Sequence, residues 1–198
     1  MHAMGKGKQV VVIAGPSGSG ETTFTNELVL AYPGKMARAI SATTRDPRGD
    51  EKDGEDYYFF DKETFFDEIQ KGNIPEHTFV KERDAYYGSY LPDLQKKLDE
   101  GKIVIVNTDR VGADYYKRNH NAETIFIEPK IIEVLRKRIE ERDPSVSKHE
   151  VDVRILQAMR EIVDAAGAYD HVVFNTDGEF AETMTSVVEI LKREGYSV

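Results

Sequence analysis

Short apolar runs alternate with amphipathic stretches along most of the chain. Five of these runs favour β-strands, and they cover residues 9–14, 37–42, 103–107, 124–127 and 171–174. The first and third runs are continuously apolar over most of their length, which is typical of strands covered on both faces, as in a parallel sheet between helices. Parallel strands need crossover connections, and the helical stretches between the runs supply them. The pattern therefore predicts an α/β fold with a parallel β-sheet flanked by helices.

The amphipathic stretches have the periodicity of helices. In residues 148–167 apolar side chains recur at steps of three and four, beginning with Val151 and Ile155, and Gly167 is suited to end the helix. Residues 179–194 carry a similar apolar face. Residues 21–31 are compatible with a helix that follows the first strand.

Residues 41–88 break the alternation of strands and helices. This segment is rich in Asp, Glu, Tyr and Gly, with strand-like pieces at 57–60 and 78–81, a helical stretch near 62–71 and a turn at 86–89. It predicts a small α+β insertion on the parallel core. A second polar segment, residues 140–150, contains Pro144 and is predicted to be a mobile connection between two helices.

Composition narrows the class of protein. The net charge of −9 over 198 residues argues against general binding of nucleic acid or of anionic membranes, so any anion site must be a local cluster of Arg and Lys. The absence of cysteine excludes disulfides, thiolate zinc sites and a cysteine nucleophile, and it suits a reducing, cytoplasmic compartment. No apolar run approaches the length that spans a bilayer. We expect a cytoplasmic monomer or homodimer.

The most informative motif follows the first strand. Residues 15–22, Gly-Pro-Ser-Gly-Ser-Gly-Glu-Thr, match the phosphate-binding loop G-x-x-x-x-G-K-[ST] except that Glu21 takes the place of the lysine. Glycines allow the main-chain N–H groups to converge on a phosphate, and the following helix adds the partial positive charge of its N-terminus. The hydroxyl of Thr22 could hold Mg²⁺. A carboxylate at position 21 conflicts with this chemistry.

Three further clusters carry candidate chemistry, and each also has a structural interpretation. Arg45 and Arg48 could grip a phosphate, or they could be solvated arginines in a polar turn. Aromatic and acidic residues near Tyr57 and Tyr87 could contact a nucleotide, or they could pack in a core. The third cluster is a helix face that is apolar at Ile131 and Leu135 and cationic further on, so it could close on phosphates or be a solvated helix end.

Taken together, these segments resemble the guanylate kinase family. The matching segments are the GPSGSG loop, SATTRDPR, DGEDYYF, YYGS, RKRIEER and YDHVVFN, and the resemblance runs from about Val10 to Leu191. Families of this kind have a phosphate-loop core, an acceptor-nucleotide domain and a lid. The resemblance implies a core of residues 9–40, 98–130 and 158–196, a GMP-binding insertion of residues 41–97 and a lid of residues 131–157. It implies the transfer of the ATP γ-phosphoryl group to GMP with Mg²⁺.

The resemblance also assigns roles to individual residues. Ser41 and Glu76 would bind the guanine edge, and the acceptor phosphate would be held by Arg45, Arg48, Tyr57 and Tyr87, with Ser89 close by. Arg138, Arg142 and Arg154 would close on the transferring phosphoryl group, and Asp109 would lie near the acceptor and the magnesium shell. ATP would be bound by Gly15, Ser17, Gly18, Ser19, Gly20, Glu21, Thr22 and Thr23, with Asn175 near the adenine.

The sequence departs from the family at several positions. Glu21 replaces the loop lysine, Asn107 stands where an acidic residue is frequent, and the segment between Glu76 and Tyr87 is two residues longer than usual. Three interpretations remain open. The chain is a guanylate kinase that Glu21 impairs, or a catalytically silent module that binds GMP or a phosphorylated peptide, or a kinase for another purine-like monophosphate. A dinucleotide-binding oxidoreductase is disfavoured because the glycines do not follow G-x-G-x-x-G.

Overall fold

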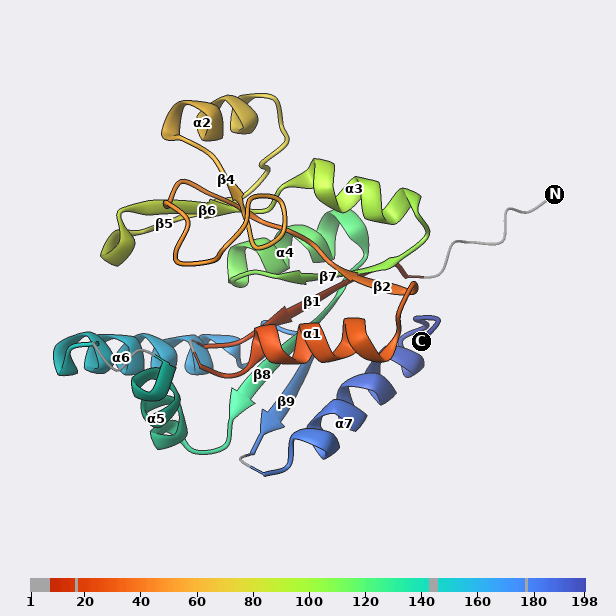
Figure 1. The fold of residues 1–198 in the computed structure, drawn as a ribbon. Coiled ribbons are helices and arrows are strands. Elements are labelled where there is room, and N and C mark those ends of the chain that lie inside the picture. The colour runs from red at the N-terminus through yellow and green to blue at the C-terminus, as the bar shows by residue number, and fades with distance from the viewer. Residues whose placement is uncertain (1–7, 17, 143–145, 177) are drawn as a thin grey trace.

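Five parallel strands form the central layer of the molecule (Figure 1). The computed structural model describes residues 8–16, 18–142, 146–176 and 178–198. The sheet order is β2-β7-β1-β8-β9, and every neighbouring pair runs parallel. The strands are β1 (Val10–Ala14), β2 (Met36–Arg38), β7 (Ile103–Asn107), β8 (Glu123–Pro129) and β9 (His171–Asn175). The predicted α/β fold is confirmed.

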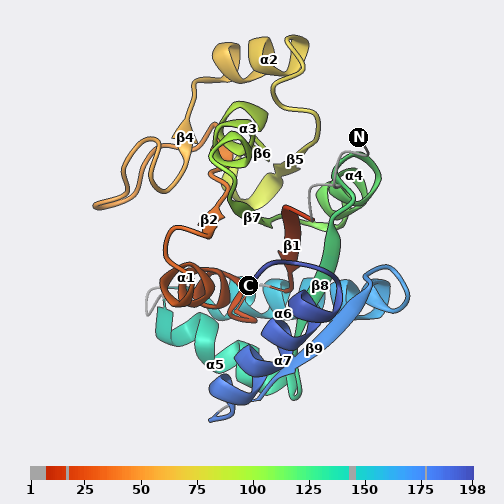
Figure 2. The same cartoon turned by 90° about the vertical axis from the view of Figure 1, so that its right-hand side faces the viewer.

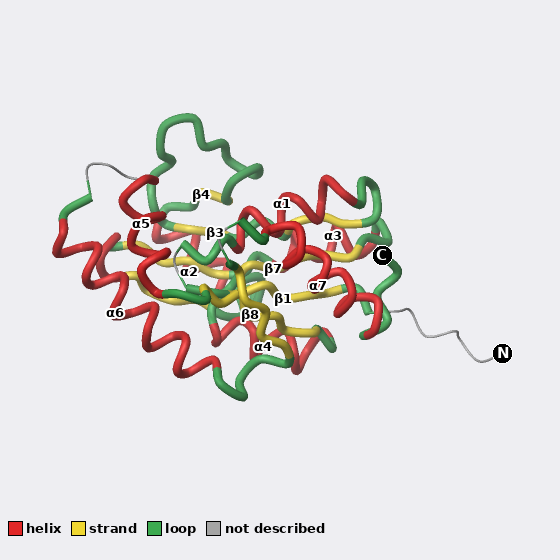
Figure 3. The backbone as a smooth tube through the Cα atoms, turned by 90° about the horizontal axis from the view of Figure 1, so that it is seen from below, coloured by secondary structure: helices red, strands yellow, loops and turns green. Residues whose placement is uncertain are grey.

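Helices cover both faces of this sheet, as Figure 3 shows. Alternate residues of β1 point to opposite faces: Val11 and Ile13 pack with α1 (Glu21–Ala31) and α7 (Phe180–Arg193), whereas Val10 and Val12 pack with helices on the other face. Those helices are α3 (Leu91–Asp99), α4 (Arg110–His120) and α6 (Lys148–Ala165). The continuously apolar strands are therefore explained by two separate cores.

The expected strand at residues 37–42 is wrong in one respect. The strand β2 ends at Arg38, and Ala42 belongs to β3 (Ala42–Thr43) in a different sheet. Between them the amide of Ile40 donates a 2.8 Å hydrogen bond to the Asp93 carboxylate and takes no part in a strand ladder. An apolar run shows that a segment is buried, but it does not show where the chain leaves one sheet for another.

The insertion predicted for residues 41–88 is a small α+β unit with its own sheet. Its strand order is β4-β3-β6-β5, and the elements are β4 (Tyr58–Phe59), α2 (Lys62–Gln70), β5 (His77–Val80), the 3₁₀-helix η1 (Lys81–Arg83) and β6 (Ala85–Gly88). The sequence Tyr86-Tyr87-Gly88 was expected in a turn, and it lies instead in β6, which pairs antiparallel with both β3 and β5. The turn itself comes earlier, at Asp84, whose φ is 45°.

The segment expected to form a lid is a pair of helices, α5 (Ile132–Arg142) and α6. They share a small core built from Leu135, Ile139, Val151 and Ile155. Part of the predicted mobile connection, residues 143–145, lies outside the described residues. In Figures 1 and 2 this helix pair and the insertion extend from the core on either side of the β1–α1 connection. No helix in the described ranges is long and apolar enough to cross a membrane.

Candidate active site at the glycine-rich loop

The loop between β1 and α1 has the backbone geometry that only glycine adopts readily. Gly18 and Gly20 have φ values of 90° and 102°. A Cβ atom at Gly15 would lie 2.5 Å from the carbonyl oxygen of Ile127, so this position has no room for a side chain. Gly20 is also the N-cap of α1 and offers that helix end no side-chain hydrogen bond. The first-turn amides are therefore left for a ligand.

Two side chains from distant segments hold this loop. The amide Nδ2 of Asn175, at the end of β9, donates a 2.7 Å hydrogen bond to the carbonyl oxygen of Ser19. The guanidinium of Arg138, on α5, donates a 3.1 Å hydrogen bond to the carbonyl oxygen of Gly18. Ser19 itself is fully buried and lines neither of the two cavities described below. Ser17 lies outside the described residues.

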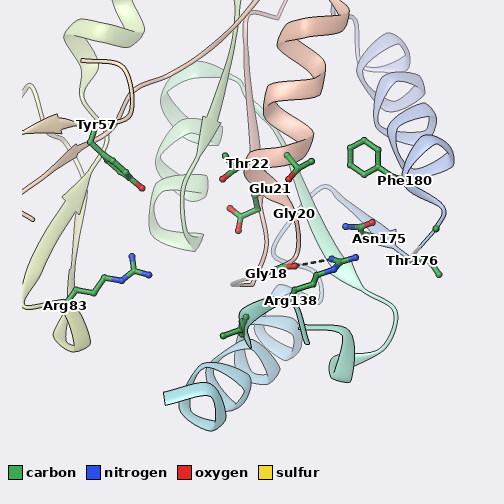
Figure 4. Close-up of a pocket in the computed structure, with 13 residues that line it drawn as sticks. Gly18, Gly20, Glu21, Thr22, Tyr57, Arg83, Arg138, Asn175, Thr176 and Phe180 are labelled. Carbon is green, nitrogen blue, oxygen red and sulfur yellow. Dashed lines mark hydrogen bonds between the residues drawn. The ribbon is translucent and has the colours of Figure 1, made fainter. Parts of the chain in front are cut away.

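Two cavities that share lining residues lie over the loop, and Figure 4 shows the first of them. The first, about 540 Å³, is lined by Gly18, Gly20, Glu21, Thr22, Thr23, Tyr57, Arg83, Arg138, Ile139, Asn175, Thr176, Gly178 and Phe180. The second, about 500 Å³, reaches from Gly15 and Thr22 to Asp109, Glu161 and Tyr169. Both are lined by Glu21, Thr22, Tyr57 and Arg83. Residues of the loop and of the insertion therefore face one another across a continuous space.

Asp109 lines the second cavity, caps a helix and accepts a hydrogen bond from the insertion. Its Oδ1 caps α4 by accepting hydrogen bonds from the amides of Val111 and Gly112, at 2.9 and 3.2 Å. Its Oδ2 accepts a 2.6 Å hydrogen bond from the hydroxyl of Thr78 in β5. The core and the insertion are thus linked at the residue that was predicted to lie beside the acceptor.

Arg45 is held by an internal carboxylate. Its two terminal nitrogens donate to the two carboxylate oxygens of Glu51 at 2.8 and 3.0 Å, and its Nε donates to the hydroxyl of Tyr87 at 3.2 Å. The pair raises the pKa of Arg45 and lowers the pKa of Glu51. The ring of Tyr57 lies 5.5 Å from the guanidinium carbon. The fork that would bind a phosphate already binds a carboxylate in this structure.

The buried carboxylate in this part of the insertion is Glu76. The side chain is 8% exposed, and its Oε1 accepts hydrogen bonds from the amide and the hydroxyl of Ser89. Burial raises the pKa of Glu76, although the hydrogen bonds from Ser89 oppose this shift. Ser41 immediately precedes β3, and its carbonyl oxygen accepts a 2.9 Å hydrogen bond from the amide of Tyr58.

Three predicted arginines are less closely placed. Arg48 is exposed, and its backbone amide donates to Glu51. Arg154 pairs with Glu150 on its own helix and lines neither cavity. Arg142 is the last residue of α5, and its side chain lies outside the described part of the chain. Of the predicted arginines whose side chains are described, Arg138 alone donates a hydrogen bond to the glycine-rich loop.

Comparison with known proteins identifies the family of this chain. The family profile for guanylate kinase matches residues 7–194. This chain belongs to the guanylate kinase family. It is 35% identical to a guanylate kinase of Bacteroides thetaiotaomicron over 94% of this chain and 91% of the relative, and 35% identical to one of Myxococcus xanthus over 96% and 90%. A crystal structure of guanylate kinase from Anaplasma phagocytophilum superposes with a TM-score of 0.73 at 29% identity, covering 96% of this chain and 88% of that one.

Glu21 stands where the phosphate-binding loop motif has a lysine. Burial raises the pKa of its carboxyl group well above the usual value, and the charge of Glu161 across the second cavity adds to the shift. None of the described residues donates a hydrogen bond to Glu21 or forms an ion pair with it. The ionised carboxylate of Glu21 is therefore partly desolvated without an attractive partner, and this raises the free energy of the folded protein.

One functional candidate was missed by sequence reasoning. Arg83 lies in η1, within the segment that was predicted to be longer than usual, and it lines both cavities. The sequence did not indicate Arg83 because it lies among other charged residues and belongs to no recognisable motif. The predicted extra length of the segment between Glu76 and Tyr87 was the one feature of the sequence that could have drawn attention to Arg83.

We predict that Glu21→Gln stabilises the protein at neutral pH by roughly 1 kcal/mol, because it removes an ionised carboxylate that is half-buried and has no hydrogen-bond or ion-pair partner among the described residues. The folded pKa of Glu21 is raised above the unfolded value, so the penalty disappears as pH falls towards the ordinary glutamate range. Urea unfolding between neutral and mildly acidic pH should show the difference shrinking as the acid form takes over. The exposed Glu27→Gln variant on the same helix is the control, and an equal effect of both variants would contradict the prediction.

Proposed function

We propose that the protein transfers the γ-phosphoryl group of ATP to GMP, giving ADP and GDP. A phosphate oxygen of GMP forms the new bond to the γ-phosphorus, while the bond from that phosphorus to the β–γ bridging oxygen breaks and ADP leaves. The observation that carries the proposal is the shared cavity, in which the glycine-rich loop faces Tyr57 of the insertion. In-line transfer needs two nucleotides placed end to end, and little covalent work from the protein.

The donor side of the site is the loop and the start of α1. The first-turn amides would bind phosphate oxygens of ATP, and the partial positive charge of the helix N-terminus favours them there. Arg138 and Asn175 line the same cavity, where Arg138 would reach the transferring group and Asn175 would lie towards the base. Arg154 would contribute only if the α5–α6 pair moves towards the loop, since it lines neither cavity here.

The residues present suit a magnesium ion. Thr22 is exposed and lines both cavities, and Asp109 supplies a carboxylate at the edge of the second. Such hard oxygen groups, together with nucleotide phosphates, are the ligands that Mg²⁺ takes in phosphoryl-transfer sites. A bound Mg²⁺ would neutralise charge that develops on the phosphates. The protein's own part is to keep Thr22 at the open end of α1 and Asp109 fixed as the cap of α4.

The acceptor side lies in the insertion. Arg45, Tyr57 and Tyr87 would bind the GMP phosphate, and Glu51 must yield at least part of the Arg45 fork when the phosphate arrives. Arg48, on the exposed turn beside them, would add a second guanidinium. Glu76 would accept hydrogen bonds from the two N–H donors of guanine, with Ser89 holding its carboxylate and Ser41 nearby.

A catalytically silent module that binds GMP is the second candidate function. The observation that favours it is Glu21, a carboxylate facing the place where ATP phosphates would lie. A single unit charge at about 4 Å is worth about 4 kcal/mol at an effective dielectric near 20, so replacing a cation with an anion at this place is a large change. Retention of the acceptor residues would then serve binding alone.

Paired kinase assays decide between the two functions. We expect the wild-type protein to phosphorylate GMP with Mg·ATP, and Glu21→Lys to raise kcat/KM for ATP by roughly tenfold or more, because lysine supplies an attractive charge. Release of ADP is measured, with Glu27→Lys as a control for the same charge change on an exposed face of α1. No activity in either protein, with GMP still bound, would favour the silent module. An equal effect of both substitutions would contradict the charge argument.

Acid pH should weaken GMP binding through Glu76. Its pKa is raised by burial, so the carboxylate becomes protonated, and loses its ability to accept both guanine N–H groups, at a higher pH than an ordinary glutamate. Calorimetric titrations across mildly acidic pH should show affinity falling with pH in the wild type. Glu76→Gln should bind GMP weakly and lack this component. The phosphate of GMP titrates equally in both proteins, and identical pH profiles would overturn the role of Glu76.

A further inference from the structure

The turn between β5 and β6 presents an arginine to the glycine-rich loop. The 3₁₀-helix η1 and the left-handed residue Asp84 carry the chain across this turn. Arg83, the last residue of η1, lines both cavities together with Glu21 and Thr22. In Figure 4 the guanidinium of Arg83 extends from the insertion into the space that the loop faces from the other side.

The contacts of Arg83 leave most of its hydrogen-bonding capacity unused. Its Nη1 donates a long, 3.4 Å hydrogen bond to the hydroxyl of Tyr87, and its guanidinium carbon lies 5.7 Å from the centre of that ring. Within the described ranges Arg83 forms no ion pair with a carboxylate. A guanidinium has five N–H donors, so several remain for an anionic ligand.

The charge balance of the cavities shows what such a cation would do. Glu21, Asp109 and Glu161 bring carboxyl groups to the second cavity. Arg138 lines only the first cavity, and Arg110 lines only the second and donates a hydrogen bond to the carbonyl oxygen of Asp164. Among the described lysines and arginines, Arg83 alone lines both cavities. A phosphate chain that crosses from one cavity to the other must pass it.

We propose that Arg83 contacts the transferring phosphoryl group and supplies the positive charge that Glu21 cannot supply from the loop. The inference rests on the proposed function and adds a catalytic residue to it. The cation thus comes from the acceptor-side insertion rather than from the donor loop. A planar guanidinium binds two phosphate oxygens at once and stabilises the charge that spreads over them during transfer.

A double-mutant cycle tests this assignment. Arg83→Met keeps an unbranched side chain over the Tyr87 ring and removes the charge. We expect it to lower kcat/KM for ATP roughly 100-fold in the wild-type background, at the low end of the loss found when one donor to a transition-state oxyanion is removed. In the Glu21→Lys background the same substitution should cost less than roughly tenfold, because the lysine then supplies the missing charge.

A matched variant and a binding measurement complete the experiment. Lys81 lies on the same 3₁₀-helix as Arg83 but lines neither cavity. Lys81→Met therefore removes a cation from this helix and should leave kcat/KM nearly unchanged. Affinity for a non-hydrolysable ATP analogue, measured by calorimetry, should fall roughly tenfold in Arg83→Met even if turnover is slow. Thermal unfolding of each variant verifies that it is folded.

The outcomes separate this inference from the proposed function. If Arg83→Met behaves like Lys81→Met in both turnover and analogue affinity, the role of Arg83 is overturned while GMP phosphorylation stands. If Arg83→Met lowers kcat/KM equally in the wild-type and Glu21→Lys backgrounds, Arg83 does not supply the charge that a lysine at position 21 would supply, and the inference is likewise overturned. If Glu21→Lys neither phosphorylates GMP nor binds it, the proposed function itself fails.

Discussion

The hydrogen bond from the Asn175 amide to the carbonyl oxygen of Ser19 ties the end of the last core strand to the glycine-rich loop. The rest of the site depends on this tie, because glycine leaves the loop many accessible backbone conformations and the tie helps to select the one with positive φ at Gly18 and Gly20. With the loop fixed, α1 begins with uncapped amides facing a cavity. Arg138 reinforces the same turn from α5, so movement of the helix pair is coupled directly to the phosphate-binding backbone.

Periodicity predicted the core well because its strands are buried on both faces. β7 and α1 lie where the pattern put them, and β1, β8 and β9 differ only at their ends. The expected strand at residues 37–42 is instead divided between β2 and β3, which belong to different sheets. The helices α3 and α4 were missed because each contributes few buried apolar residues, such as Leu94 and Tyr116. In the insertion the pattern predicted α2, β4 and most of β5, but it placed Tyr86-Tyr87-Gly88 in a turn, and these residues form β6.

The site was predictable where a backbone motif defines it and less so where side chains choose their partners. The sequence placed Gly18, Thr22 and Tyr57 at one site, and all three line the first cavity. It gave no indication that Glu51 would occupy the fork of Arg45, or that Asp109 would serve as a helix cap. Arg83 was overlooked because it belongs to no motif, and the sequence alone does not show that the turn between β5 and β6 brings it to both cavities.

The glycine-rich loop and the insertion together line two adjoining cavities, and we propose that these bind two nucleotides end to end. The most direct test is a bisubstrate compound in which guanosine and adenosine are joined through a polyphosphate bridge, titrated by calorimetry. Because the two halves are linked, the account predicts binding at least tenfold tighter than that of GMP, in the range expected for joined ligands, and complete displacement by excess GMP with ATP. Binding no tighter than GMP alone, or binding that GMP leaves undisturbed, would contradict it.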